Sequence, residues 1–242
     1  MRYRGEIDGL RAVAVGSVVL FHAGLPWFHG GFVGVDIFFV ISGFLITSIL
    51  MSELAEGRFS LVNFYERRAR RILPALYLVM AASLPFAWAW LMPGHMKQFA
   101  LSVASVSLFS SNIQFWRESG YFDTAADFKP LLHTWSLAVE EQYYILFPLF
   151  LMLTWRLGRR RIFWLLAAAA AVSLAMAQWG SHHKPEATFY LLPTRGWELL
   201  IGSLAACHLH ERHGQPDRRA FDQWASLLGL ALILYSILVF DS

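Results

Sequence analysis

Cysteine and charged residues are scarce in this sequence. One of the 242 residues is cysteine and 15% are charged, whereas 57% are hydrophobic. The single cysteine, Cys207, excludes an internal disulfide and a cysteine-rich metal site, and its apolar neighbours indicate a packing role without redox chemistry. So little charge also excludes a soluble domain with a polar exterior. The composition therefore predicts a polytopic membrane protein.

The excess of basic over acidic residues is small, 20 against 17. The basic residues form short clusters between apolar runs instead of covering one face of a domain. Such clusters indicate the topology of a membrane protein, and we expect no nucleic acid partner.

Seven apolar runs are long enough to cross a bilayer, which takes about 20 helical residues. They lie near residues 10–27, 32–51, 72–92, 133–154, 162–180, 190–208 and 223–240. Basic segments flank them at residues 2–11, 67–71, 156–161 and 210–219. The positive-inside rule places all four segments, and with them the N-terminus, in the cytoplasm. The first run follows basic residues as in a signal peptide, but no small-residue cleavage site comes after it, so we expect a retained span.

An eighth run, residues 98–115, fits this topology only if it does not cross the membrane. If it crossed fully, both later basic segments would lie outside the cell. Its stretch "SVASVSLFSSN" is rich in serine and asparagine, and non-helical backbone at membrane depth is tolerated only inside protein or beside a water-filled cavity. We therefore predict an outer loop at 93–131 that is partly re-entrant. The predicted fold is an all-α polytopic helical membrane bundle of about seven transmembrane helices, in one domain over residues 1–242.

Three ionisable residues lie in or beside the first two runs. Arg11 and His22 are eleven residues apart, which places them within about 20° on one face of a helix and about 16 Å apart along its axis. Asp36 stands near the start of "GGFVGVDIFFVISGFLI", where an unpaired carboxylate is costly. If "GLPWFHGG" joins two antiparallel helices, a buried His22 lies at the same depth as Asp36. The carboxylate then makes the imidazole a general base for a hydroxyl, or the two form an ion pair that only joins the helices.

The fourth run opens with "HTWSLAVEEQYY" and carries three polar side chains on one stripe. His133, Ser136 and Glu140 fall within about 60° of one helical face, so we expect them to face the protein interior. Polar lining of a cavity fits them better than a hydrolytic triad, because three residues of one helix are poorly placed for attack. Glu141 lies about 100° away, and we expect it to contact a different helix.

Two further charged groups lie at helix starts. Arg195 and Glu198, in "YLLPTRGWELL", are three residues apart on one face and form either an internal salt bridge or part of a cavity lining. In the cytoplasmic "ERRARRILP", guanidinium groups and helix N-terminal amides converge, which predicts a phosphate site. The four arginines of this segment are Arg67, Arg68, Arg70 and Arg71. The alternative for them is an ordinary positive-inside anchor.

In order and spacing, five motifs resemble those of the acyltransferase-3 family of membrane-bound O-acetyltransferases. They are Arg11 with His22, "GGFVGVDIFFVISGFLI", "RRARRILP", "LLHTWSLAVEEQYY" and "LLPTRGWELLIG". The resemblance implies transfer of an acyl group, usually acetyl, from cytoplasmic acetyl-CoA as co-substrate to a hydroxyl of a cell-envelope glycan. Lipopolysaccharide O-antigen, exopolysaccharide and peptidoglycan are such acceptors. It also implies no metal, no permanently bound cofactor and a location in the bacterial inner membrane.

The resemblance further implies roles for the residues above. His22 is the general base or a transient acyl acceptor, and Arg11 is its partner along the same helix face. The arginines at 67, 68, 70 and 71 lie near the CoA phosphates. The pore-lining site is completed by Asp36, Ser136, Glu140 and Glu141.

Family members usually have about ten spans, and many add a C-terminal periplasmic hydrolase-like domain that passes the acyl group to its acceptor. We therefore expect this chain to be incomplete at its C-terminus, without spans eight to ten and without such a periplasmic acyl-accepting domain. A proton-coupled secondary transporter is the alternative function, because carriers also use ionisable residues inside the membrane. A purely structural subunit is disfavoured, because burying so many ionisable groups costs stability.

Overall fold

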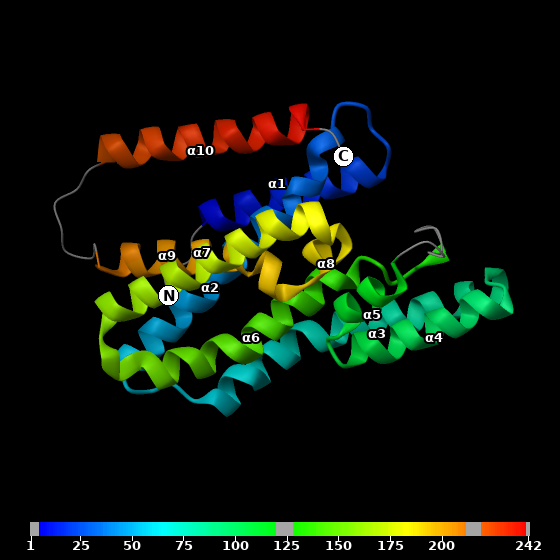
Figure 1. Cartoon of the computed structure of the whole chain (residues 1–242), viewed down its shortest axis with the longest axis horizontal. Helices are drawn as coiled ribbons and strands as arrows, with labels where there is room; N and C mark the ends of the chain where they lie inside the picture. Colours follow the sequence, from blue (N-terminus) through cyan, green and yellow to red (C-terminus); the bar gives the residue numbers. More distant parts are fainter. Residues whose placement is uncertain (1–4, 120–127, 212–218, 241–242) are drawn as a thin grey trace. The chain divides into compact units, whose positions relative to one another are not determined.

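The computed structural model describes residues 5–119, 128–211 and 219–240. Within these ranges every regular element is a helix (Figure 1). The long helices are α1 Gly5–His22, α2 Gly34–Ala55, α3 Leu61–Trp90, α6 Thr134–Thr154, α7 Arg159–His183, α9 Leu192–Glu211 and α10 Arg219–Val239. The shorter ones are η1 His29–Val33, α4 Pro93–Ser107, α5 Ser111–Glu118, η3 Trp155–Leu157 and α8 Pro185–Tyr190. The prediction of an all-α fold is confirmed.

Five helical segments are long and apolar enough to cross a membrane. They are His29–Ala55, Leu61–Trp90, Thr134–Leu157, Arg159–His183 and Asp222–Val239. Helices α1 and α9 overlap the other two predicted spans. Because α1 carries Glu6, Asp8 and Arg11 within 18 residues, it is more polar than an ordinary span. The chain is thus a multi-pass helical protein, and the count of seven spans stays a prediction.

The predicted outer loop at 93–131 is helical over most of its described length. It contains α4 and α5, and α4 lies along the second half of α3 (Figure 1). The serines that suggested an irregular loop bond to the carbonyls of their own helix: Ser102 Oγ donates to Gln98 O at 3.0 Å and Ser107 Oγ to Val103 O at 2.8 Å. Serine hydroxyls can therefore be satisfied inside a helix. Re-entry into the membrane stays a prediction, and residues 120–127 lie outside the described part.

The chain divides into two compact units. Unit 1 comprises Met1–Ile49 and Glu198–Ser242, and unit 2 comprises Leu50–Trp197. Unit 2 is therefore inserted in the sequence between the two halves of unit 1.

In unit 1, α2 and α9 approach so closely that both contact positions are glycine. A Cβ on Gly43 would overlap the carbonyl oxygen of Leu199, and a Cβ on Gly202 would overlap the carbonyl oxygen of Val40. Next to this contact, Thr47 Oγ1 lies 2.8 Å from Ser203 Oγ, and both side chains are completely buried. Small residues that bring helix backbones together, with hydroxyls bonding across, are a typical membrane helix interface.

In unit 2, a buried amide pair joins three helices. Asn112 of α5 is 0% exposed; its Nδ2 donates to Tyr190 O of α8 at 3.1 Å, and its Oδ1 accepts from Gln142 Nε2 of α6 at 2.8 Å. Gln142 Nε2 also lies 3.0 Å from Phe109 O. These bonds hold α5 and α8 against the first turns of α6.

We expect Asn112→Ala to destabilise unit 2. The substitution removes the bonds of Asn112 to the partly buried Tyr190 carbonyl and to the Gln142 amide, which costs about 1 kcal/mol or more. Thermal unfolding of the purified protein in detergent measures the loss. Asn63→Ala is the matched control, because that side chain is exposed on α3 and exposed substitutions usually change stability by about 0.5 kcal/mol at most. Equal melting temperatures for the two variants would contradict the structural role of the amide pair.

Candidate functional site

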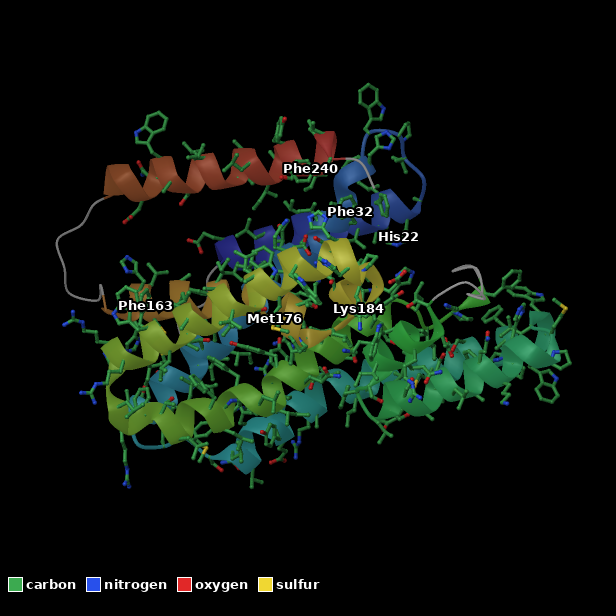
Figure 2. The ribbon with its side chains drawn as sticks, viewed as in Figure 1. His22, Phe32, Phe163, Met176, Lys184 and Phe240 are labelled. Carbon is green, nitrogen blue, oxygen red and sulfur yellow. The ribbon has the colours of Figure 1, made fainter. Side chains whose placement is uncertain are left out.

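His22 is the last residue of α1, and its ring is exposed (Figure 2). Its Nδ1 lies 2.8 Å from Val18 O. A carbonyl oxygen only accepts hydrogen bonds, so Nδ1 carries the proton in the neutral ring and Nε2 carries the lone pair. The expectation of a buried imidazole is wrong, because α1 ends at His22 and the following residues up to Trp27 are exposed.

The register between α1 and the following chain separates His22 and Asp36 in depth. Gly31 packs against Ser17 and Gly34 against Ala14. The pairing of α1 with α2 therefore places Asp36 near the level of Ala12, about 15 Å along the helix axis from His22. The expected equal depth is wrong, because η1 already runs back along α1. The chain reverses near Gly24, which has φ of 72°, and not at the centre of "GLPWFHGG". Asp36 consequently lies at nearly the depth of Arg11.

Arg11 is half-buried on α1. Its Nη1 lies 3.7 Å from Asp8 Oδ1, one turn earlier in the same helix. The structure therefore gives Arg11 a carboxylate neighbour on its own helix that the sequence analysis did not consider.

The four arginines at the start of α3 point in different directions. Arg67 Nη2 lies 2.8 Å from Glu53 Oε1, and Arg70 Nη2 lies 2.6 Å from Glu66 Oε1. The side chain of Arg71 is exposed, whereas Arg68 is half-buried. At about 100° per residue, Arg67, Arg70 and Arg71 fall within about 100° of one exposed helix face, and Arg68 projects to one side of them. Their binding of phosphate stays a prediction.

The start of α6 buries one carboxylate, and it is not the expected one. Glu141 is 6% exposed, Ser136 and Glu140 are half-buried, and His133 is exposed. Ser136 Oγ donates to the carbonyl oxygen of His133 at 3.2 Å. The expectation that His133, Ser136 and Glu140 all face the interior is therefore wrong for His133. The face that carries Glu141 is the one that packs on α3.

Arg195, near the start of α9, lies among aromatic rings. Its Cζ is 5.6 Å from the ring centroid of Trp135 and 5.8 Å from that of Phe189, and the two rings are themselves 4.6 Å apart. Such cation–π contacts stabilise a guanidinium group away from water. Sequence reasoning missed this aromatic cage: Trp135 belongs to the motif "HTWSLAVEEQYY", but Phe189 lies just before "YLLPTRGWELL". The predicted ion pair of Arg195 with Glu198 stays a prediction, and Glu198 is 1% exposed.

In the described ranges, no three histidine, cysteine, aspartate or glutamate side chains gather in a way that could hold a metal ion.

These features define a multi-pass helical membrane protein with buried charged side chains and a histidine presented at a helix end. The family profile Acyl_transf_3, described as acyltransferase domain, matches residues 4–242. The chain belongs to this acyltransferase-3 family, and the resemblance inferred from the five motifs is confirmed.

Named relatives are similar over most of this chain. It is 38% identical over 213 residues to the putative peptidoglycan O-acetyltransferase YrhL of Bacillus subtilis, which covers 85% of this chain and 33% of the relative. It is 35% identical over 214 residues to the peptidoglycan O-acetyltransferase OatA of Listeria monocytogenes, with 85% and 34% covered. The putative membrane-bound transacylase BcsY of Komagataeibacter xylinus is 38% identical over 203 residues, with 83% and 50% covered. The chain thus spans between a third and a half of the length of these relatives. No solved structure matches it.

Proposed function

We propose that the protein is a membrane O-acyltransferase that moves an acetyl group from acetyl-CoA to a hydroxyl of an envelope glycan. Membership of the acyltransferase-3 family supports acyl transfer. Two relatives bear the name peptidoglycan O-acetyltransferase, so peptidoglycan is the first acceptor to test. Short basic segments support a position in the bacterial inner membrane with the N-terminus in the cytoplasm.

His22 carries the proposal. Its Nδ1 is bonded to Val18 O, which directs the basic Nε2 lone pair away from the helix. In one route Nε2 takes the proton of the acceptor hydroxyl, the hydroxyl oxygen attacks the thioester carbonyl, and the CoA sulfur leaves and receives the proton. In the other route Nε2 itself attacks the carbonyl, the C–S bond breaks and the CoA sulfur leaves and takes up the Nδ1 proton. The acetylated imidazole then passes the acetyl group to the oxygen of a later acceptor hydroxyl, whose proton returns to the ring. A periplasmic acyl-accepting domain, if joined to this chain, would serve the second route.

The remaining predicted residues have supporting roles in this proposal. Arg67, Arg68, Arg70 and Arg71 supply positive charge for the CoA phosphates. Arg11 and Asp36, which lie at nearly the same depth, flank the path to His22. Polar side chains of α6 and α9 line the passage of donor and acceptor: Ser136, Glu140, Glu141, Arg195 and Glu198. His133, exposed just before α6, lies at its entrance in this proposal.

The test uses membranes that contain the protein, acetyl-CoA labelled in the acetyl group, and peptidoglycan fragments. We expect label in the glycan that mild alkali releases as acetate, together with free CoA in equal amount. Both products should depend on the acceptor. If the protein is instead a proton-coupled transporter, solute movement will follow the proton gradient and no acetyl-CoA will be consumed.

A further inference from the structure

Unit 2 contains two buried polar atoms of opposite hydrogen-bonding character, on neighbouring helices. Glu141 of α6 is 6% exposed, and its Oε1 has no hydrogen-bond partner among the described residues. Arg68 of α3 is half-buried, and its buried Nε also has no partner there. Leaving such groups unsatisfied is costly, and buried polar groups are nearly always bonded. This arrangement calls for a bound group.

The contact between α3 and α6 is well defined at this point. Tyr65 Oη donates to Ile145 O at 2.9 Å, which fixes the register of the two helices. The Cζ of Arg68 lies 5.7 Å from the ring centroid of Phe64 and 5.8 Å from that of Tyr144. Both rings are buried, so the guanidinium group is held by aromatic faces.

Arg68 and Glu141 interact electrostatically but do not form a direct ion pair. Neighbouring arginines of the same helix pair with other carboxylates, Arg67 with Glu53 and Arg70 with Glu66. Since these two side chains form no direct hydrogen bond or ion pair, the buried Nε of Arg68 and the buried Oε1 of Glu141 can both bond to one group between them. That group must accept from the Nε–H of Arg68 and donate to the Oε1 of Glu141.

We propose that Arg68 and Glu141 together bind a secondary amide of the pantetheine arm of acyl-CoA. The amide carbonyl accepts from Arg68, and the amide N–H donates to Glu141. The pantetheine arm carries two such amides in an otherwise mostly apolar chain, which suits walls made of Phe64 and Tyr144. This inference rests on the proposed function. It moves Arg68 from the phosphates, to which that function assigns all four arginines, to the pantetheine arm, and it leaves the phosphates to the three exposed arginines of the segment.

The experiment measures binding of acetyl-CoA to the purified chain in lipid nanodiscs. A hydrogen bond to a charged group contributes enough for its loss to weaken binding about ten- to hundredfold. We expect Glu141→Leu to show this loss in affinity and Glu141→Gln, whose amide oxygen still accepts, to show a smaller one. Glu56→Gln is the control, since Glu56 is an exposed loop residue paired with Arg58, and it should bind like the parent.

A donor analogue tests the same bond without altering the protein. We expect the parent to bind acetyl-CoA with N-methylated pantetheine amides about as weakly as Glu141→Leu binds ordinary acetyl-CoA. In the Glu141→Leu variant, methylation should lower the affinity little further. An equal penalty in parent and variant, or full affinity of Glu141→Leu for acetyl-CoA, would overturn the inference. If the variant fails to fold, undiminished binding of the methylated analogue by the parent overturns it instead. Absence of any acetyl-CoA binding by the parent would instead contradict the proposed function itself.

Discussion

Replacing His22 by alanine should lower glycan acetylation by about 10² to 10⁴-fold, the contribution typical of a positioned acid or base. Because Nδ1 donates its proton to Val18 O, Nε2 is the nitrogen of His22 that can accept a proton. Alanine removes this nitrogen. The measurement is transfer of labelled acetyl from acetyl-CoA to peptidoglycan fragments, at equal amounts of folded protein. His182→Ala is the matched control, because His182 is an exposed histidine of α7 and should leave the rate within about twofold.

A folded His22→Ala variant that keeps more than half of the parent's rate would show that this histidine is not catalytic. Labelled acetyl-CoA offered without acceptor separates the two routes. Label that stays on the parent protein, is released by hydroxylamine and is absent from the variant identifies His22 as the acyl carrier. A labelled glycan product without any labelled protein identifies it as the general base.

The second large effect concerns the contact between α2 and α9. We expect Gly43→Leu to prevent folding of unit 1, because even its Cβ would overlap the backbone carbonyl of Leu199. A backbone atom cannot move aside without moving its helix, so the cost exceeds the about 1–3 kcal/mol of ordinary overpacking. The intrinsic gain of about 1 kcal/mol from removing a helical glycine is too small to compensate. Yield and melting temperature in detergent measure the outcome.

Gly229→Leu provides the comparison for this variant. Gly229 also lies within a helix, α10, but no atom outside its own helix turns lies within 4 Å of the position of a Cβ there. We expect that variant to fold as well as the parent or slightly better. Similar yields and melting temperatures for both leucine variants would mean that α2 and α9 do not pack through glycine.

The helices and their apolar character were predictable from the sequence, because length and composition decide whether a helix suits a membrane. The position of the reversal after α1 was not. A hairpin drawn through the middle of "GLPWFHGG" takes residues 24–31 as turn, whereas the last three of them already belong to η1, which packs on α1. An error of a few residues in the position of a turn shifts the register of antiparallel helices by about twice that number. This shift explains why the sequence predicted equal depth for His22 and Asp36.

Periodicity also could not decide which face of α6 is buried. Glu140 and Glu141 are adjacent in sequence and differ by about 100° around the helix. Either side chain could therefore be buried, each against a different neighbouring helix. The contact with α3, through Tyr65 and Arg68, turns Glu141 inward. The same tertiary contact separates Arg68 from its neighbouring arginines. Such choices depend on residues some 75 positions away along the chain, and no local pattern contains them.

The bond between Thr47 and Ser203 joins residues that are 156 positions apart, and this distance bears on how the protein is made. While the ribosome is still synthesising the middle of the chain, the partner face of α2 does not yet exist. The contiguous segment 50–197 can assemble first, since domains generally fold as units during synthesis. Until α9 is synthesised, the glycine face of α2 lacks the helix against which it packs. Completion of unit 1 is therefore a late step of biogenesis, and a nascent chain stopped before residue 203 lacks the surface against which α2 packs.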